Sequence, residues 1–201
     1  MPNVCVFGDS IAWGSWDPVG GGWAGRLREA GCTRQTDHCN PRTGDYTAVL
    51  NCSVNGNKIA DLLARFDGEA SARDAAAIVL AIGLNDVPHD GYSGTTPEAF
   101  ELAYGDLIAR AKNYANDIVA VTPINVDESR SEHDYRNTDI AILVEVIARC
   151  AADADLPVVN VFGLMTPDDL HPDGLHPGAQ GHEKLFRAIG PVLFGLPSLN
   201  D

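Results

Sequence analysis

The feature that most constrains the fold of this 201-residue chain is an alternation of short apolar segments with longer amphipathic ones. The apolar runs are largely β-branched, as in parallel strands buried on both faces. They lie at 3–7, 47–52, 76–82, 117–122 and 157–161. Segments with helical periodicity lie between and after them, at 22–30, 58–66, 97–114, 136–154 and 182–194. This alternation predicts right-handed βαβ units, and therefore a five-stranded parallel sheet with helices on both faces, an α/β/α sandwich in three layers.

The charge balance limits the classes of molecule that this protein can bind. The chain carries 28 acidic and 14 basic side chains, a formal net charge of −14. Such a protein repels phosphate backbones and anionic lipid surfaces, so we expect no nucleic-acid partner. The longest apolar run, residues 75–84, is far shorter than the roughly 20 residues that span a bilayer. The N-terminus has no basic segment of a signal peptide, and we expect a cytoplasmic protein without membrane insertion.

The cysteines do not form the pattern of a disulfide framework. There are five, an odd number at irregular spacing. Cys5, Cys52 and Cys150 lie in apolar segments and are predicted to be buried free thiols. Cys32 and Cys39 allow two further interpretations, a loop disulfide or, with His38, part of a metal site. No fourth ligand with zinc-like spacing lies nearby.

A candidate nucleophile follows the first predicted strand. In open parallel sheets, sites form outside the carboxyl ends of the strands. Gly8-Asp9-Ser10 stands at such an end, where Gly8 permits a sharp turn that lifts Ser10 to the edge of the sheet. We expect Ser10 at or near the N-terminus of a helix, where unpaired backbone N–H groups favour a developing negative charge. Taken alone, the tripeptide is equally typical of an ordinary turn.

Two further strand ends carry groups suited to bind a developing negative charge. Gly56, in Asn55-Gly56-Asn57, allows close approach of a backbone N–H, and the Asn85 side chain can donate from its NH₂ group. Each also fits a simple polar turn. For the first turn, Asn57 is then the expected N-cap of the next helix.

A carboxylate and an imidazole precede the last predicted helix. Asp173 and His176 are three residues apart in a turn, a spacing that lets the carboxylate orient the imidazole. Asp168 and His171 repeat this spacing five residues earlier. We favour the second pair because the helix-start signals follow it directly. With Ser10, it completes a triad in the order Ser, Asp, His.

The four blocks together resemble the SGNH hydrolases, the GDSL-type esterases and lipases. Gly-Asp-Ser, a lone glycine in Asn-Gly-Asn, Gly-x-Asn-Asp and Asp-x-x-His-Pro occur in order between residues 4 and 185. The resemblance implies one flavodoxin-like hydrolase domain over residues 1–201, with Ser10, Asp173 and His176 catalytic and no cofactor or metal. It implies an oxyanion hole of Ser10, Gly56 and Asn85. The Asn-Gly-Asn block departs mildly from the commoner Ser-Gly context, which leaves the role of Gly56 open.

The implied reaction is hydrolysis of a small-molecule ester through an acyl-enzyme. No hydrophobic lid helix is evident in the sequence, which favours short-chain acyl or acetyl esters. Trp13, Trp16, Pro88 and Tyr92 flank the predicted site and are candidate substrate contacts. The long polar connection at 123–135 is consistent with a lid or with a solvated surface loop.

Several alternatives stay open at this point. The same triad serves a thioesterase, a lysophospholipase or an acyltransferase. A metal-dependent hydrolase would use the cluster from Asp168 to His176, which also contains Asp169, His171 and Asp173. A ligand-binding module without catalysis would use the same crevice.

Overall fold

The computed structural model describes residues 3–33 and 47–194. His38 and Cys39 lie outside these residues, and so does the side chain of Cys32, so the predicted loop disulfide or metal site falls outside the described part of the chain. Cys5, Cys52 and Cys150 are buried and free, which confirms the prediction for these three thiols.

Five parallel strands form the predicted sheet, in the order β2-β1-β3-β4-β5. The strands are β1 (Asn3–Gly8), β2 (Ala48–Asn51), β3 (Ala75–Ala81), β4 (Asp117–Val121) and β5 (Val158–Val159). The last strand is shorter than the predicted 157–161. The reason is a side chain: Thr122 Oγ1 accepts from the Val161 N–H at 2.9 Å, where a continued ladder would use a backbone carbonyl.

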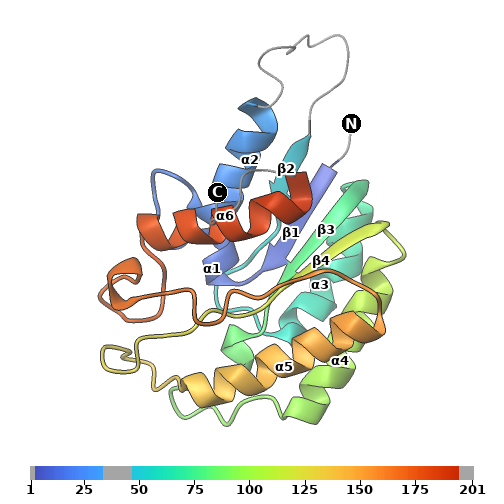
Figure 1. Cartoon of the computed structure of the whole chain (residues 1–201). Helices are drawn as coiled ribbons and strands as arrows, with labels where there is room; N and C mark the ends of the chain where they lie inside the picture. Colours follow the sequence, from blue (N-terminus) through green and yellow to red (C-terminus); the bar gives the residue numbers. More distant parts are fainter. Residues whose placement is uncertain (1–2, 34–46, 195–201) are drawn as a thin grey trace.

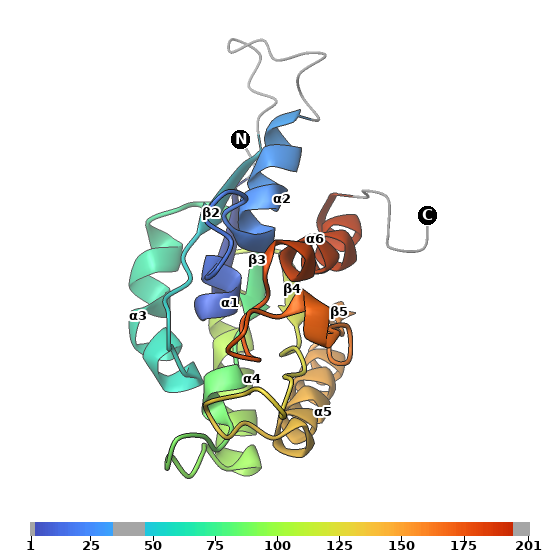
Figure 2. The ribbon, with the colours of Figure 1, turned by 90° about the vertical axis from the view of Figure 1, so that its left-hand side faces the viewer.

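Helices cover both faces of this sheet, which confirms the predicted α/β/α architecture (Figures 1 and 2). The helices are α1 (Ser10–Trp13), α2 (Gly22–Thr33), α3 (Ile59–Ser71), α4 (Pro97–Ala111), α5 (Asn137–Asp153) and α6 (Ala179–Phe194). Helices α2 and α6 pack together on one face, and α3, α4 and α5 form the layer on the other. None of the helices in the described part of the chain is long and apolar enough to cross a bilayer.

The starts of α4 and α3 show where local sequence signals predict the first residue of a helix and where they do not. Helix α4 begins as predicted, because Thr96 Oγ1 accepts from the Ala99 N–H and Pro97 occupies the first helical position. The predicted N-cap of α3, Asn57, is wrong. Lys58 is the N-cap, and the Asp86 carboxylate accepts from the Ile59 N–H at 2.9 Å. That acceptor comes from a distant loop, so helix propensity near Asn57 gave no sign of it.

A one-turn helix, α1, directly follows β1, where Ser10 was expected at or near the N-terminus of a helix, although the bounds of that helix were not predicted. Gly8 makes the connection possible, since a Cβ at this position would lie 2.4 Å from the Ala81 carbonyl oxygen. The Asp9 side chain then caps α1 by accepting from the Ile11 N–H at 3.0 Å. Ser10 is therefore the first residue of α1, at the carboxyl edge of the sheet.

Candidate active site

Ser10, His176 and Asp173 form a continuous hydrogen-bonded series. Ser10 Oγ lies 2.9 Å from His176 Nε2, and His176 Nδ1 lies 2.8 Å from Asp173 Oδ2. Because the carboxylate can only accept, the proton of the neutral imidazole is on Nδ1, and Nε2 accepts from the Ser10 hydroxyl. The arrangement places a base beside the hydroxyl and an orienting carboxylate behind the base.

The Asp173 carboxylate is held by the turn in which it lies. Its Oδ1 accepts from the Leu175 N–H at 2.9 Å and from the His176 N–H at 3.0 Å. Burial raises the pKa of Asp173, but these backbone hydrogen bonds and the His176 ring outweigh burial, and the pKa lies below its ordinary value. Asp173 is therefore ionised at neutral pH and can stabilise an imidazolium.

The alternative carboxylate–imidazole pair of the sequence, Asp168 and His171, does not form in the structure. Asp168 is exposed, and Asp169 instead pairs with Lys184 and accepts from Thr166 at the start of a short 3₁₀ turn, η2 (Pro167–Asp169). His171 stacks on Trp16, with ring centroids 4.0 Å apart. Within residues 3–33 and 47–194, no three His, Cys, Asp or Glu side chains gather to hold a metal ion. This speaks against the metal-dependent alternative.

Gly56 and Asn85 line the same cleft as Ser10. Gly56 has a φ of +75°, and its N–H has no hydrogen-bond partner among the described residues. Asn85 lies in the 3₁₀ turn η1 (Leu84–Asp86), which follows Gly83 at a φ of +130°. Two loops that are distant in sequence thus bring N–H donors to the same cleft, which Ser10 and His176 also line.

This cleft has a volume of about 550 Å³ and mixes aromatic with polar side chains. Trp13 and Trp16 line it, each about half exposed, at 54% and 55%. Pro88 and Tyr92, the other candidate substrate contacts, are not among its lining residues. From the same loop, His89 and Asp90 line it instead.

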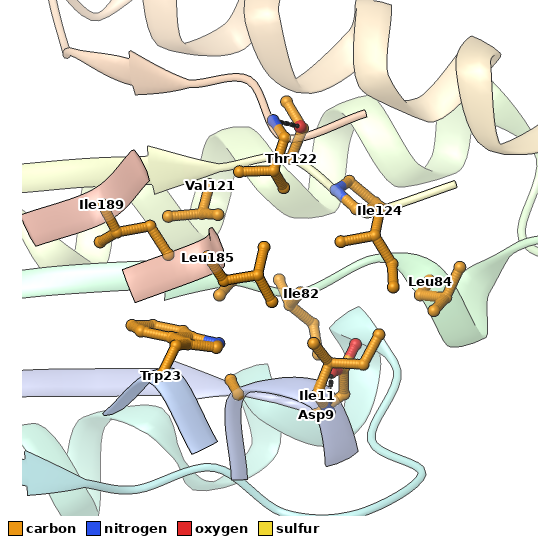
Figure 3. A pocket seen from close by; sticks show the side chains of 14 residues that line it. Asp9, Ile11, Trp23, Ile82, Leu84, Val121, Thr122, Ile124, Leu185 and Ile189 are labelled. Atoms are coloured by element: carbon orange, nitrogen blue, oxygen red, sulfur yellow. Dashed lines mark hydrogen bonds between the residues drawn. The ribbon is translucent and has the colours of Figure 1, made fainter. Parts of the chain in front are cut away.

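A second hollow lies inside the protein and is distinct from the cleft (Figure 3). It measures about 30 Å³, little more than a water molecule requires, and its walls are mostly apolar side chains such as Trp23, Leu185 and Ile189. Asp9 borders it and is 4% exposed. Burial raises the pKa of Asp9 to about 7, against the effect of the Ile11 N–H. The cavity contains none of the reactive groups, and its size excludes an acyl chain.

Two residues of the site were not among the predicted site residues. Tyr135 lines the cleft and donates its hydroxyl to Asn85 Oδ1 at 3.1 Å, from 50 residues away. Asp86, next to Asn85, is completely buried and caps α3. Asp86 belongs to the Gly-x-Asn-Asp motif, which is a signal for this position, but its bond to Ile59, 27 residues away, cannot be predicted from spacing.

The long connection between β4 and α5, residues 122–136, is anchored across the site. The Asp127 N–H donates to the Gly174 carbonyl at 2.8 Å, next to Asp173. Further along, His133 Nδ1 lies 2.7 Å from Asp90 Oδ2, and Tyr135 bonds Asn85. The connection therefore joins the loop of the histidine to the loop of the amide donor, while other side chains along it, such as Glu128 and Glu132, are exposed as expected for a solvated loop.

Comparisons with known proteins agree with this architecture. Residues 6–184 match the model of the GDSL-like lipase/acylhydrolase family. The chain is 24% identical over 152 residues to an acetylxylan esterase from Geobacillus stearothermophilus, covering 70% of this chain and 69% of that protein. A lipase/acylhydrolase structure from Enterococcus faecalis matches with a TM-score of 0.81 at 24% identity, over 97% of this chain and 96% of the other.

Three structures of an acetylxylan esterase from Geobacillus stearothermophilus are also similar. They are described as catalytic mutants in which a serine, an aspartate or a histidine is replaced by alanine. Each has a TM-score of 0.74 at 19–20% identity and covers 96% of this chain and 94% of the other. At such identities the structural likeness establishes the fold.

Proposed function

The chain belongs to the GDSL-like lipase/acylhydrolase family, and from that premise we propose that it is a serine esterase that forms an acyl-enzyme on Ser10. The observation that carries the proposal is the unbroken series from Ser10 Oγ through the His176 ring to Asp173, at 2.9 and 2.8 Å. The Geobacillus structures support it, since the aspartate and histidine altered there are also three positions apart.

In the proposed reaction, His176 Nε2 takes the proton of Ser10 as Oγ bonds to the acyl carbon. The carbonyl oxygen becomes an oxyanion, which the Gly56 N–H, the Asn85 amide and the Ser10 N–H stabilise. The imidazolium, held by Asp173, gives its proton to the departing alkoxide, and the acyl group remains on Ser10. A water molecule then reacts by the same steps, releasing the carboxylic acid and restoring Ser10.

The lining of the cleft supports a short acyl group on a neutral, hydroxyl-rich alcohol such as a saccharide. Trp13 and Trp16 offer flat apolar surfaces on which a sugar ring can pack. Nδ1 of His89 bonds the Val87 carbonyl, and Nδ1 of His133 bonds Asp90. Among the described residues, Nε2 of neither ring has a hydrogen-bond partner. Neutral imidazoles bonded in this way accept hydrogen bonds from hydroxyls through Nε2.

Two further observations favour this substrate class. The net charge of −14 disfavours anionic esters such as acyl-CoA or phospholipids. The relative from Geobacillus stearothermophilus is an acetylxylan esterase, which agrees with an acetyl group on a sugar hydroxyl. The proposed substrate is therefore a small-molecule acetyl ester of a saccharide.

The test is a substrate panel applied to the wild type, Ser10→Ala and Ser93→Ala. The panel contains p-nitrophenyl esters from acetate to palmitate, acetylated xylo-oligosaccharides and acetyl-CoA. Ser93 is a matched control because it is exposed and lies outside the cleft. We expect the acetyl esters to be the best substrates, Ser10→Ala to be inactive and unlabelled by a fluorophosphonate, and Ser93→Ala to behave as the wild type. Esterase activity in purified Ser10→Ala would refute the assignment, and a preference for palmitate or acetyl-CoA would refute the substrate class.

A further inference from the structure

The Asn85 side chain is held at both ends of its amide. Nδ2 donates to the Asn57 carbonyl at 3.1 Å, and Oδ1 accepts from the Tyr135 hydroxyl at 3.1 Å. The Asn57 carbonyl can only accept, so the NH₂ end of the amide faces Asn57 and the oxygen faces Tyr135. An NH₂ group has two hydrogens, and one of them remains for the cleft that Asn85 lines.

Tyr135 is itself fixed in place. It is 2% exposed, and its ring stacks on His89, with centroids 4.6 Å apart and an angle of 16° between the planes. His89 is tied to its own loop by the bond from Nδ1 to the Val87 carbonyl, at 2.8 Å. Burial and the charges of Asp9 and Asp90 raise the pKa of Tyr135 well above its ordinary value. Its hydroxyl therefore keeps its proton and stays a donor.

We propose that Tyr135 is a positioning residue for the amide donor Asn85, holding the amide plane so that the free Nδ2–H serves the oxyanion. This inference rests on the proposed function. When that N–H donates to an oxyanion, electron density moves toward Oδ1, and the bond from Tyr135 strengthens with it. Tyr135 thus acts mainly in the transition state, although it does not contact the reacting atoms.

The expected effect is modest and specific to turnover. Removal of one neutral hydrogen bond predicts that Tyr135→Phe lowers kcat by about 3- to 10-fold, with KM for p-nitrophenyl acetate unchanged within about twofold. Tyr114→Phe is a matched control, because its hydroxyl bonds Asp67 away from the cleft, and we expect an unchanged kcat.

A double-mutant cycle separates positioning from a general structural effect. If Tyr135 acts through Asn85, then adding Tyr135→Phe to Asn85→Ala lowers kcat no further. A second readout is the side-chain amide resonance of Asn85 in ¹⁵N NMR, assigned by its loss in Asn85→Ala. We expect Tyr135→Phe to shift this resonance and Tyr114→Phe to leave it in place.

The inference is overturned if Tyr135→Phe turns over as the wild type, if it lowers kcat equally with and without Asn85, or if the amide resonance does not move. Melting temperatures of all variants are measured alongside, and the NMR readout applies even to a variant with weak activity. Ser10→Ala in the same series keeps the two proposals distinct. If Ser10→Ala is active, the proposed function fails, whereas a normal Tyr135→Phe beside an inactive Ser10→Ala refutes only the role of Tyr135.

Discussion

The two sides of the cleft are built in different ways. On the relay side, defined by Ser10, His176 and Asp173, the side-chain bonds that orient His176 and begin α1 are local, although Ser10 and His176 themselves are 166 residues apart. Asp173 holds His176 three residues along the chain, and Asp9 caps Ile11 two residues along. Each half of the relay side is therefore a short turn, and the fold of the sheet brings the two turns together.

The oxyanion side, defined by Gly56 and Asn85, depends on contacts between distant loops. The partners of Asn85 are Asn57 and Tyr135, 28 and 50 residues away. Asp86, the next residue, caps α3 at Ile59, 27 residues away. The difference shows that local turns orient the proposed base and place the hydroxyl, each within its own segment, whereas the side chain of the proposed amide donor is held only when three loops pack.

The largest expected effect is on the relay side. Asp173→Asn should lower kcat by about 10⁴-fold, because an amide neither stabilises an imidazolium nor selects the productive tautomer of His176. Steady-state kinetics on p-nitrophenyl acetate measure this. Asp168→Asn is the matched control, since Asp168 is exposed, and it should retain full activity. If Asp168→Asn were the inactive variant, the two pairs would have been assigned in the wrong order.

Asp9, the buried side chain that caps α1 on the relay side, predicts that the stability of the protein depends on pH. The pKa of Asp9 is raised from 3.8 to about 7, so between these values the folded state holds a proton that the unfolded state has lost, and stability falls as pH rises. Asp9→Asn keeps an oxygen for the Ile11 N–H but cannot ionise. Its free energy of unfolding should therefore fall less than that of the wild type between pH 4 and pH 8, by about 4 kcal/mol.

Urea unfolding at a series of pH values measures this difference. Asp86→Asn is the corresponding variant on the oxyanion side. Burial raises the pKa of Asp86 only to about 6. The difference in unfolding free energy between wild type and Asp86→Asn should therefore be smaller and should stop growing at a lower pH. Parallel stability curves for wild type and Asp9→Asn would contradict the prediction.

On the oxyanion side, Asn85→Ala should lower kcat by about 10²–10³-fold, the usual cost of losing one oxyanion donor. This loss is smaller than that of Asp173→Asn because the other donors remain, and it is larger than that of Tyr135→Phe because the donor itself is removed. Kinetics on the same ester place the three variants in order. A loss from Asn85→Ala as large as that from Asp173→Asn would mean that the two sides contribute equally.

The smallest expected effect is that of a chelator. Among the described residues, no group of three His, Cys, Asp or Glu side chains could hold a metal ion, and Asp169, the buried carboxylate of the rival cluster, pairs with Lys184. Dialysis against EDTA should leave kcat and KM unchanged. Loss of activity with recovery on addition of zinc would favour the metal-dependent alternative.

Much of the fold could be predicted from the sequence, because burial on both faces imposes apolar runs on parallel strands and periodicity on their helices. The observed strands and the five long helices lie within a few residues of the predicted segments. What was missed is short or decided by distant partners. The bounds of α1, a single turn, were not predicted, and β5 ends where the Thr122 side chain takes the place of a ladder bond. The acceptor that caps α3, in place of the predicted Asn57, is the side chain of Asp86.

The sequence by itself determined the fold class and, through its motifs, the family to which the chain belongs, because those properties follow from local pattern and spacing. It also named Ser10, Asp173 and His176 as candidates, since a turn of a few residues arranges the last two. Only the tertiary structure decided which side chains hold Asn85, what lines the cleft, and that residues 122–136 join its two sides. These depend on hydrogen bonds between loops tens of residues apart. Such contacts arise from packing, which no local sequence pattern predicts.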